Sequence, residues 1–405
     1  MDVYLARQPI FDRNREIFAY ELLFRGGMEN FFPDIDGDSA TSRLLSNTFF
    51  NTGLEQITGG KRAFINFTRE LIMKRAAMLF PAQLTTVEIL ENIRPDCEIV
   101  DELKELVREG YVLALDDFLY SPELEPFIEL ADIVKIDFKQ SSHQEIMADA
   151  AWYLSKDKKL LAEKVETSEE FDLARSLGFT YFQGYFFSKP QLIRKVDIPT
   201  LKMNMLNIMA EARKDDFNFG RLESLISRDL GISYKLLRYL NSPYYRRLSE
   251  ISSIRQAIVM LGEKGIHQFL GVIILSELSQ DKPDELLKSS VIRARMCENF
   301  GTLKGQRDSS ELFTLGLFSH IDAILDNTME HIMTMLPLSE SIKKTLLGEK
   351  TALSDYLDLA TSYEYAAWDS VETLSPALGI APENLPQIYL DALGWADSLC
   401  AVENS

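Results

Sequence analysis

The amino-acid sequence predicts a chain of two parts, an α/β barrel followed by an all-α domain. In the first half, short β-type runs alternate with longer amphipathic helical stretches. In the second half, helical periodicity continues almost without a break. The length supports the division, because 405 residues exceed one ordinary compact domain and each half is long enough to bury its own core.

The first half contains about eight β-type runs. Strands that alternate with helices are typical of a mostly parallel sheet, and this number of strands favours a β/α barrel over an open sheet. Amphipathic stretches at 42–57 and 96–110 lie between strands of this series. We expect strands at 3–10, 17–24, 63–67, 86–90, 112–117, 132–138, 160–165 and 181–187.

The texture of the sequence changes after Pro190. The segment 189–200 contains two prolines and no clear periodicity, which is typical of a linker. From Leu201 to the end, glycines and prolines such as Pro283 and Gly301 divide the helical pattern into nine or ten expected helices. Strand-type alternation is absent there, so this half is predicted to be all-α.

Composition limits the kinds of partner. Acidic residues outnumber basic ones by 62 to 43, and the net charge of -19 opposes non-specific binding to nucleic acid or an anionic membrane. The longest apolar runs are shorter than a membrane span, and the N-terminus has no secretory pattern. The three cysteines, Cys97, Cys297 and Cys400, lie far apart, which suits a reducing compartment. We therefore expect a cytoplasmic protein.

Polar residues stand at the ends of nearly all the expected strands. In a β/α barrel these ends form the active face. Carboxylate and amide oxygens suit Mg²⁺ or Mn²⁺, and two such ions could polarise a phosphodiester and supply a hydroxide. Acids at strand ends also serve merely to solvate loops, but their repetition at one depth favours a site. The residues are Glu21, Asn66, Glu88, Glu91, Asp116, Asp117, Lys135, Asp137, Glu163, Glu166 and Gln183.

The motifs around these residues resemble the EAL domain of bacterial cyclic di-GMP signalling. The resemblance covers residues 1 to about 195 and rests on RQPIFD, YELLFR, FINF, VEILE, LALDDF, VKID, AEKVET and QGYFFSKP in that order. It implies a modified, TIM-like β/α barrel that binds cyclic di-GMP. With Mg²⁺ or Mn²⁺, such a domain hydrolyses one phosphodiester bond and releases a linear dinucleotide.

The resemblance also implies the metal and nucleotide contacts. The implied metal ligands carry oxygen atoms on four successive strands, and they are Glu21, Asn66, Glu88 and Asp116. The side chains implied to contact the nucleotide are Gln8 and Arg25.

Four further residues are implied to serve the hydrolytic step. Asp117 would hold the second metal or the attacking water. Lys135 and Glu163 would assist the nucleophile, and Gln183 would position water.

Three positions depart from the family pattern. Leu22 replaces the signature alanine beside the first ligand, and Lys164 replaces the glycine of the AEGVE motif. Leu119 replaces the first glycine of the loop after the aspartate pair, where glycine permits positive φ. Because small misplacements of catalytic groups cost about a hundredfold in rate, these changes favour weak or absent hydrolysis. Loss of cyclic di-GMP binding does not follow from them.

The second half resembles the HDOD domain, a helical relative of HD-type phosphohydrolases. The resemblance rests on 225–245, 252–262 and 312–326. HD enzymes hold metals through histidines and an adjacent His-Asp pair, but here Ile321 separates His320 from Asp322. We therefore expect no cofactor in this domain, and expect His320 to be a helix residue that makes local hydrogen bonds. A helix-turn-helix reading of 225–240 is opposed by the apolar second helix and the acidic chain.

These observations lead to one main interpretation and two alternatives. The chain is interpreted as an EAL-like domain over 1–195 and a non-catalytic HDOD interaction domain over 196–405. The barrel would bind cyclic di-GMP or a partner with weak or no hydrolysis, and the helical domain would contact other proteins. The alternatives are an active Mg²⁺- or Mn²⁺-dependent cyclic di-GMP phosphodiesterase and an adaptor that does not use the nucleotide. No nucleic acid or membrane partner is expected, and a homodimer stays open.

Overall fold

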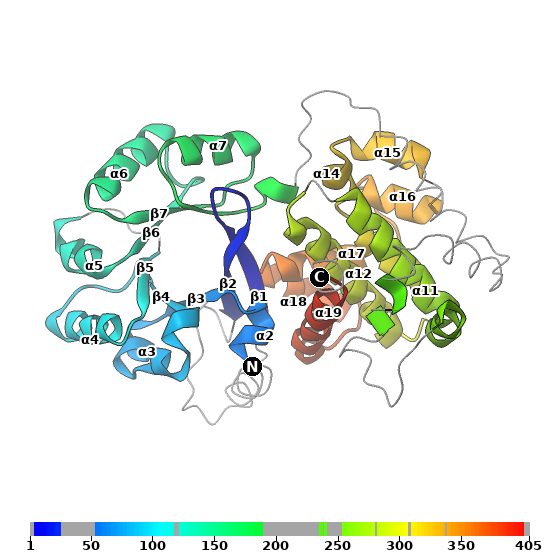
Figure 1. The fold of residues 1–405 in the computed structure, drawn as a ribbon, viewed down its shortest axis with the longest axis horizontal. Coiled ribbons are helices and arrows are strands. Elements are labelled where there is room, and N and C mark those ends of the chain that lie inside the picture. The colour runs from blue at the N-terminus through cyan, green and yellow to red at the C-terminus, as the bar shows by residue number, and fades with distance from the viewer. Residues whose placement is uncertain are drawn as a thin grey trace. The chain divides into compact units, whose positions relative to one another are not determined.

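The computed structural model describes residues 4–25, 53–116, 121–188, 235–237, 239–240, 253–279, 282–306, 309–336 and 338–400. The chain divides into two compact units, which are described separately (Figure 1). The first unit comprises Met1–Lys189 together with Tyr363–Trp368. The second comprises Pro190–Ser362 and Asp369–Ser405. The expected boundary at residue 195 lies outside the described residues and stays a prediction.

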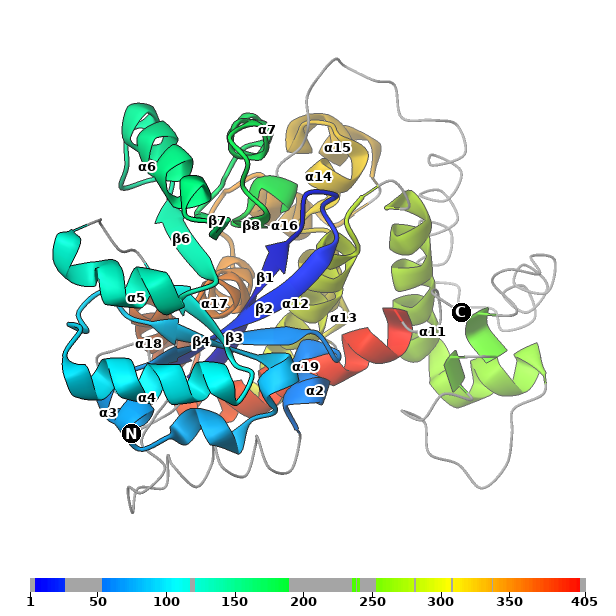
Figure 2. The ribbon, with the colours of Figure 1, turned by 60° about the vertical axis from the view of Figure 1, so that its left-hand side comes forward.

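The first unit is built on a closed barrel of eight strands in sequence order, which confirms the predicted barrel (Figure 2). Strands β2 to β8 pair in parallel, but β1 is antiparallel to both of its neighbours, β2 and β8. The strands are β1 (Tyr4–Phe11), β2 (Ile17–Arg25), β3 (Arg62–Phe67), β4 (Thr85–Ile89), β5 (Val112–Leu115), β6 (Ile133–Asp137), β7 (Lys159–Glu163) and β8 (Tyr181–Gln183).

The direction of β1 follows from the short turn that joins it to β2. The Asp12 carboxylate accepts hydrogen bonds from the backbone N–H groups of Asn14 and Glu16, at 2.8 and 3.0 Å. Arg15 adopts a left-handed conformation with a φ of 64°. A tight turn of this kind joins antiparallel strands, whereas parallel neighbours need a longer crossover.

Helices lie around the outside of the barrel (Figures 1 and 2). Helix α4 shows why they form, because Asp96 caps its N-terminus and its apolar face buries Ile99, Leu103 and Leu106. The described helices are α2 (Leu54–Thr58), α3 (Arg69–Met73), α4 (Cys97–Arg108), α5 (Glu125–Leu130), α6 (His143–Ser155) and α7 (Ser168–Ser176), with 3₁₀ turns η1 (Ala76–Leu79), η2 (Ala82–Leu84), η3 (Pro122–Leu124) and η4 (Phe186–Ser188).

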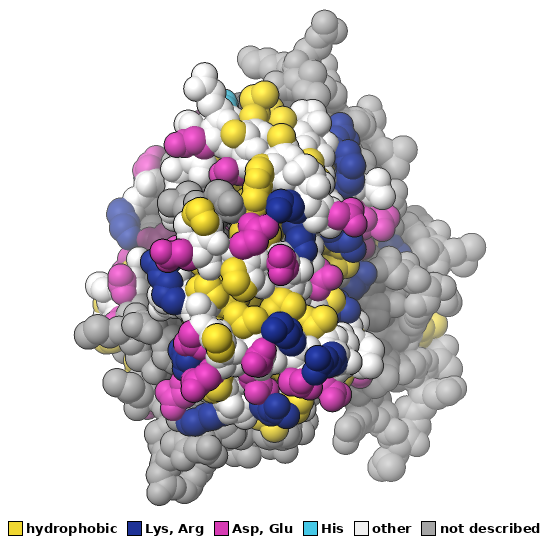
Figure 3. Space-filling view, turned by 90° about the vertical axis from the view of Figure 1, so that its left-hand side faces the viewer, with side chains coloured by type: hydrophobic (Ala, Val, Ile, Leu, Met, Phe, Trp, Pro, Cys, Tyr) yellow, Lys and Arg dark blue, Asp and Glu magenta, His cyan; other side chains and the backbone are white. Residues whose placement is uncertain are grey.

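The outer face of this unit carries mixed charges. Figure 3 shows basic and acidic side chains interleaved there around a group of hydrophobic ones. Among the described residues of the unit, the exposed large hydrophobic side chains are Met78, Leu79, Val107, Met147 and Leu154. The described part of this face therefore presents no surface of a single charge.

The barrel interior contains an apolar layer, which fixes where a polar site can lie. One inward-facing residue from almost every strand contributes to it, and the members are Ile10, Ala19, Phe64, Ala114, Ile133, Leu161 and Tyr181. Because side chains alternate along a strand, the next inward position is two residues further on. On the parallel strands that position lies closer to the carboxyl end.

The described part of the second unit is helical, as the sequence predicts. Helix α12 lies at its core and is buried along most of its length, and Gly316 of α13 packs closely against it. A Cβ atom on Gly316 would lie 2.5 Å from the backbone of Arg293 and Ala294. The helices are α11 (Ile254–Leu278), α12 (Asp284–Leu303), α13 (Ser310–Leu317), α14 (Ile321–Leu325), α15 (Met329–Met335), α16 (Glu340–Leu346), α17 (Ser354–Glu364), α18 (Trp368–Ala377) and α19 (Leu385–Cys400), with η5 (Pro382–Asn384).

One described helix is longer and more apolar than the sequence pattern indicated. Over Ile254–Ser276, α11 is long and apolar enough to cross a membrane by length and composition, with a mean hydropathy of 1.5. Half of the most apolar window is buried within the protein, and the backbone leaves helical geometry at Gly262. A core helix of a soluble protein meets the same criteria, so this is weak evidence for a span.

Most of the 225–240 segment, for which a helix-turn-helix was considered, lies outside the described residues.

Candidate active site

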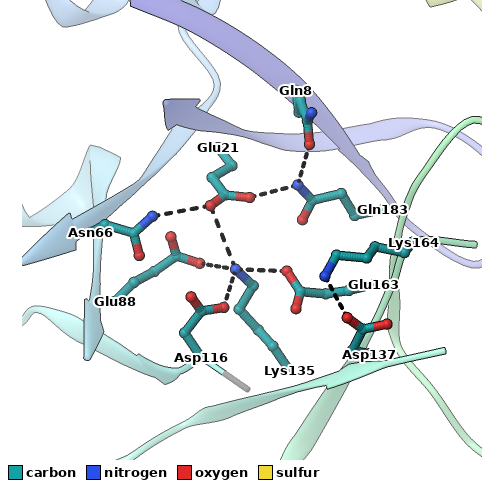
Figure 4. Close-up of polar contacts among 10 residues, drawn as sticks. All are labelled: Gln8, Glu21, Asn66, Glu88, Asp116, Lys135, Asp137, Glu163, Lys164 and Gln183. Atoms are coloured by element: carbon teal, nitrogen blue, oxygen red, sulfur yellow. Dashed lines mark hydrogen bonds and ion pairs between the residues drawn. The ribbon is translucent and has the colours of Figure 1, made fainter. Parts of the chain in front are cut away.

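Polar side chains gather in a layer inside the barrel (Figure 4). This layer lies one inward position beyond the apolar layer. Except on β4, each member stands two residues from a residue of the apolar layer on the same strand, and Asp116 lies just beyond the end of β5. The cluster, here called the polar layer, consists of Gln8, Glu21, Asn66, Glu88, Asp116, Lys135, Glu163 and Gln183. The alternation of the strands thus gathers side chains from all eight of them at one depth.

Lys135 stands at the centre of the polar layer. Its Nζ lies 2.7 Å from Asp116 Oδ1 and 2.8 Å from an oxygen of both Glu88 and Glu163. Glu21 Oε1 is further away, at 3.6 Å. Because the Lys135 side chain is only 1% exposed, these contacts are shielded from water. One buried ammonium therefore holds four carboxylates together.

The proximity of these charges shifts the pKa values. Burial lowers the pKa of Lys135, but the four surrounding carboxylates outweigh it, and the pKa ends well above its ordinary value. Burial, the Glu21 carboxylate and the Asp116 carboxylate raise the pKa of Glu88 well above its ordinary value, although Lys135 opposes them. The polar layer is thus an acidic cluster with a permanently charged cation at its centre.

Three amide side chains orient the Glu21 carboxylate. Asn66 donates to Glu21 Oε1 at 3.2 Å, and Gln183 donates to Glu21 Oε2 at 2.5 Å. Gln183 also donates to Gln8 Oε1 at 3.0 Å, and Gln8 in turn donates to the Tyr185 hydroxyl at 3.1 Å. Because the amide nitrogens face the carboxylate, the amide oxygens of Asn66 and Gln183 are buried and find no hydrogen-bond donor within the described part of the chain.

These oxygens fit a hard divalent cation. Lys135 Nζ lies 2.8 Å from Glu88 Oε1, whereas Glu88 Oε2 has no hydrogen-bond donor among the described residues. Buried oxygens without donors are costly unless a ligand or cation satisfies them. As the side chains stand, however, no three His, Cys, Asp or Glu residues in the described ranges are spaced to hold a metal ion. The carboxylates point at Lys135, so they must turn from it to hold a metal.

Two of the three departures from the family pattern are described in the structure. Leu22 is fully buried and alternates with Glu21, so its side chain faces away from the polar layer. The sequence placed it beside the first ligand, but it does not intrude on the site. Lys164 follows Glu163 directly and its ammonium contacts the Asp137 carboxylate. Leu119 lies outside the described residues.

Several expected site residues are not part of the polar layer as described. Asp117 lies outside the described residues, as does the side chain of Arg25 at the end of β2. Glu91 is exposed, and Glu166 lies 3.3 Å from Lys139 instead. The sequence analysis gave no role to Tyr185, whose hydroxyl accepts a hydrogen bond from Gln8. The only sequence signal for this contact is the position of Tyr185, two residues after Gln183.

Family models and whole-chain relatives agree on both halves of the chain. The EAL domain model matches residues 2–190, and the HDOD domain model matches residues 198–352. Cyclic di-GMP phosphodiesterase CdgJ of Vibrio cholerae is 37% identical over 402 residues, which cover 98% of this chain and 93% of CdgJ. This chain belongs to the EAL–HDOD family.

Two further proteins are similar to this EAL–HDOD protein but give less information about its function. The uncharacterized protein YuxH of Bacillus subtilis is 37% identical over 407 residues, covering 98% of this chain and 99% of YuxH. The solved structure of the Bacillus subtilis EAL protein YkuI, in complex with c-di-GMP and calcium, is 19% identical with a TM-score of 0.35. It covers 61% of this chain and 70% of YkuI, and at this TM-score it supports no further argument.

The HDOD half of this EAL–HDOD protein buries the histidine that the sequence singled out. His320 precedes α14, and its Nε2 lies 3.2 Å from the Ser289 hydroxyl on α12. The His320 carbonyl makes a local hydrogen bond, accepting from Ile324 N–H at 3.0 Å, but tertiary packing supplies its side-chain partner from another helix. Burial and the nearby Arg293 guanidinium lower the pKa of His320 well below its ordinary value, so the imidazole is neutral.

Proposed function

We propose that this EAL–HDOD protein is a divalent-metal-dependent phosphodiesterase that opens cyclic di-GMP to a linear dinucleotide. The observation that carries the proposal is the polar layer, in which oxygen-bearing side chains from seven strands converge around one lysine from the eighth, β6 (Figure 4). Among the described residues, Asn66 Oδ1, Gln183 Oε1 and Glu88 Oε2 are buried without a hydrogen-bond donor, which fits a cation. The name of the relative CdgJ supports the same substrate.

The residues that would hold Mg²⁺ or Mn²⁺ are Glu21, Asn66, Glu88 and Asp116. When bound, the metal would polarise the phosphodiester and lower the pKa of a water molecule. The acidic cluster needs this positive charge, because cyclic di-GMP is itself an anion.

The remaining members of the polar layer act on the substrate and the water. Glu163, which is held by Lys135, accepts the proton of the attacking water. The Lys135 ammonium offsets the charge that develops on the phosphoryl oxygens. Gln183 and Gln8 form a hydrogen-bonded pair beside Glu21 and orient the water and the nucleotide.

Binding of cyclic di-GMP without turnover is the second candidate, and it is the one that the sequence favours. The observation that supports it is Lys164, which occupies a left-handed backbone position next to Glu163 where the family has glycine. In that case the barrel acts as a sensor, and the HDOD domain transmits its state through protein contacts. A misplacement of Glu163 by about 1 Å is enough to cost about a hundredfold in rate.

One experiment separates the candidates. The full chain is incubated with cyclic di-GMP and Mn²⁺ or Mg²⁺ while product formation and heat of binding are followed. We expect metal-dependent turnover that falls about a hundredfold or more in Glu21→Ala. Glu109→Ala is the matched control, because Glu109 is exposed and precedes β5, at the opposite end of the barrel.

The other outcomes also decide between the functions. Turnover that survives Glu21→Ala contradicts the proposed site. Binding without turnover establishes the sensor, and the absence of both leaves an adaptor that does not use the nucleotide.

A further inference from the structure

Asp137 is a nearly buried carboxylate at the rim of the polar layer, at the end of β6. It is 4% exposed and lies opposite Glu163 in the β6–β7 register. Its Oδ1 accepts from the backbone N–H groups of Lys139 at 2.6 Å and Gln140 at 3.2 Å. Its Oδ2 forms an ion pair with Lys164 Nζ. Both oxygens of Asp137 are thus engaged outside the polar layer, and Figure 4 shows the contact with Lys164.

Lys164 makes this ion pair from an unfavourable backbone conformation. Its φ is 54°, in the left-handed region that disfavours residues with a Cβ atom. Backbone hydrogen bonds of both chain neighbours hold Lys164 in this conformation. Val165 N–H donates to Gln183 O at 3.0 Å, and Glu163 O accepts from Phe138 N–H at 3.1 Å. Glycine would fit this backbone without strain. A lysine here contributes an interaction that glycine cannot make.

That interaction changes the electrostatic balance of the site. The polar layer already contains four carboxylates against one ammonium. An unpaired Asp137 would add a fifth negative charge beside Glu163 and strengthen the attraction for a divalent cation. Lys164 cancels that charge, and because its side chain is 53% exposed it does so with little loss of its own hydration.

We propose that Lys164 is a positioning residue that pairs with Asp137, fixes the ends of β6 and β7 beside Glu163, and lowers the divalent-cation affinity of the polar layer. This inference rests on the proposed function, since it assumes that the polar layer takes up a metal. In this inference Lys164 sets the affinity of the polar layer for the metal, and no role in the hydrolytic step is assigned to it.

The test is a double-variant cycle on the full chain, with Mn²⁺ affinity measured by calorimetry and by the electron paramagnetic resonance of free Mn²⁺. We expect Lys164→Met to tighten Mn²⁺ binding and Asp137→Asn to weaken it, each by about three- to tenfold. The double variant returns close to the wild-type affinity, and Lys164→Arg, which keeps the cation, leaves it unchanged.

Lys139→Met is the matched control. Lys139 lies on the same rim and is 43% exposed, but its ammonium pairs with Glu166 at 3.3 Å and Glu170 at 3.7 Å. The Asp137 side chain beside Lys164 is 3% exposed, whereas the Glu166 and Glu170 side chains beside Lys139 are 44% and 23% exposed. Solvent therefore screens the charges that Lys139→Met uncovers, and we expect less than about a twofold change in Mn²⁺ affinity. Lys164→Gln serves as a second neutral variant, with folding of every variant checked by circular dichroism.

The signs of the changes decide the matter. Weaker Mn²⁺ binding in both single variants would indicate a purely structural role and overturn the inference, although the proposed function would stand. An equal tightening in Lys139→Met and Lys164→Met would also overturn it, because the effect would then be general surface charge. A wild-type chain that binds no Mn²⁺ would overturn both the inference and the proposed function.

Discussion

At the scale of single residues, Lys135 balances the charge of the site. Its ammonium is the cation on which the carboxylates of the polar layer converge. Removing one partner from a buried ion-pair network leaves like charges unpaired, which is far more costly than the pair itself is favourable. Since its folded pKa is raised above the ordinary value, Lys135 stays protonated and stabilising throughout the neutral range.

Replacing Lys135 therefore tests whether a metal can take the place of the ammonium. We expect Lys135→Met to lower the free energy of unfolding by about 3–5 kcal/mol at neutral pH. Urea unfolding measures this, and added Mn²⁺ is expected to restore part of the loss. Lys159→Met is the control, because Lys159 is exposed at the start of β7. A loss below about 1 kcal/mol would show that the four carboxylates do not depend on Lys135.

At the scale of elements, strand alternation explains most of what the sequence predicted about the site. Because every second side chain of a strand points into the barrel, Glu21, Asn66 and Glu88 lie one layer beyond the apolar layer. Polar residues near the ends of different strands in the sequence therefore meet in the structure. The same rule turns Leu22 away from the site, a consequence that the motif comparison missed. The Lys164–Asp137 pair was not predicted, because Lys164 lies just past the end of β7 in a left-handed backbone conformation that strand alternation does not assign.

The contact between α12 and the start of α14 gives the second unit a pH dependence. His320 is neutral when folded, with its pKa lowered by burial and by Arg293, but it takes up a proton near pH ~6.5 once unfolded. The unfolded state then binds more protons, so stability is lost as pH falls below that value.

Unfolding at two pH values tests this prediction. Between pH 7 and 5.5 we expect the wild type to lose about 1 kcal/mol more than His320→Gln. His331→Gln is the control because His331 is exposed, and it should behave as the wild type. The account is wrong for His320 if all three proteins lose stability equally.

At the scale of the whole molecule, both fold classes were predicted because hydrophobic residues repeat with the period of strands in the first half and of helices in the second. The eight β-type runs became a closed barrel and the second half is helical where it is described. Period alone could not assign the direction of β1, which depends on the short turn at Asp12. The segment 117–120, which contains Leu119, lies outside the described residues.

A single-turnover reaction tests the central claim most directly. The full chain, in excess over cyclic di-GMP, is mixed with Mn²⁺ in ¹⁸O-labelled water, and the nucleotides are analysed by mass spectrometry. Excess enzyme reveals even slow hydrolysis. The account predicts a linear dinucleotide that carries one ¹⁸O atom on its terminal phosphate. Recovery of the cyclic dinucleotide unchanged, from a protein shown to be folded and loaded with Mn²⁺, would contradict it.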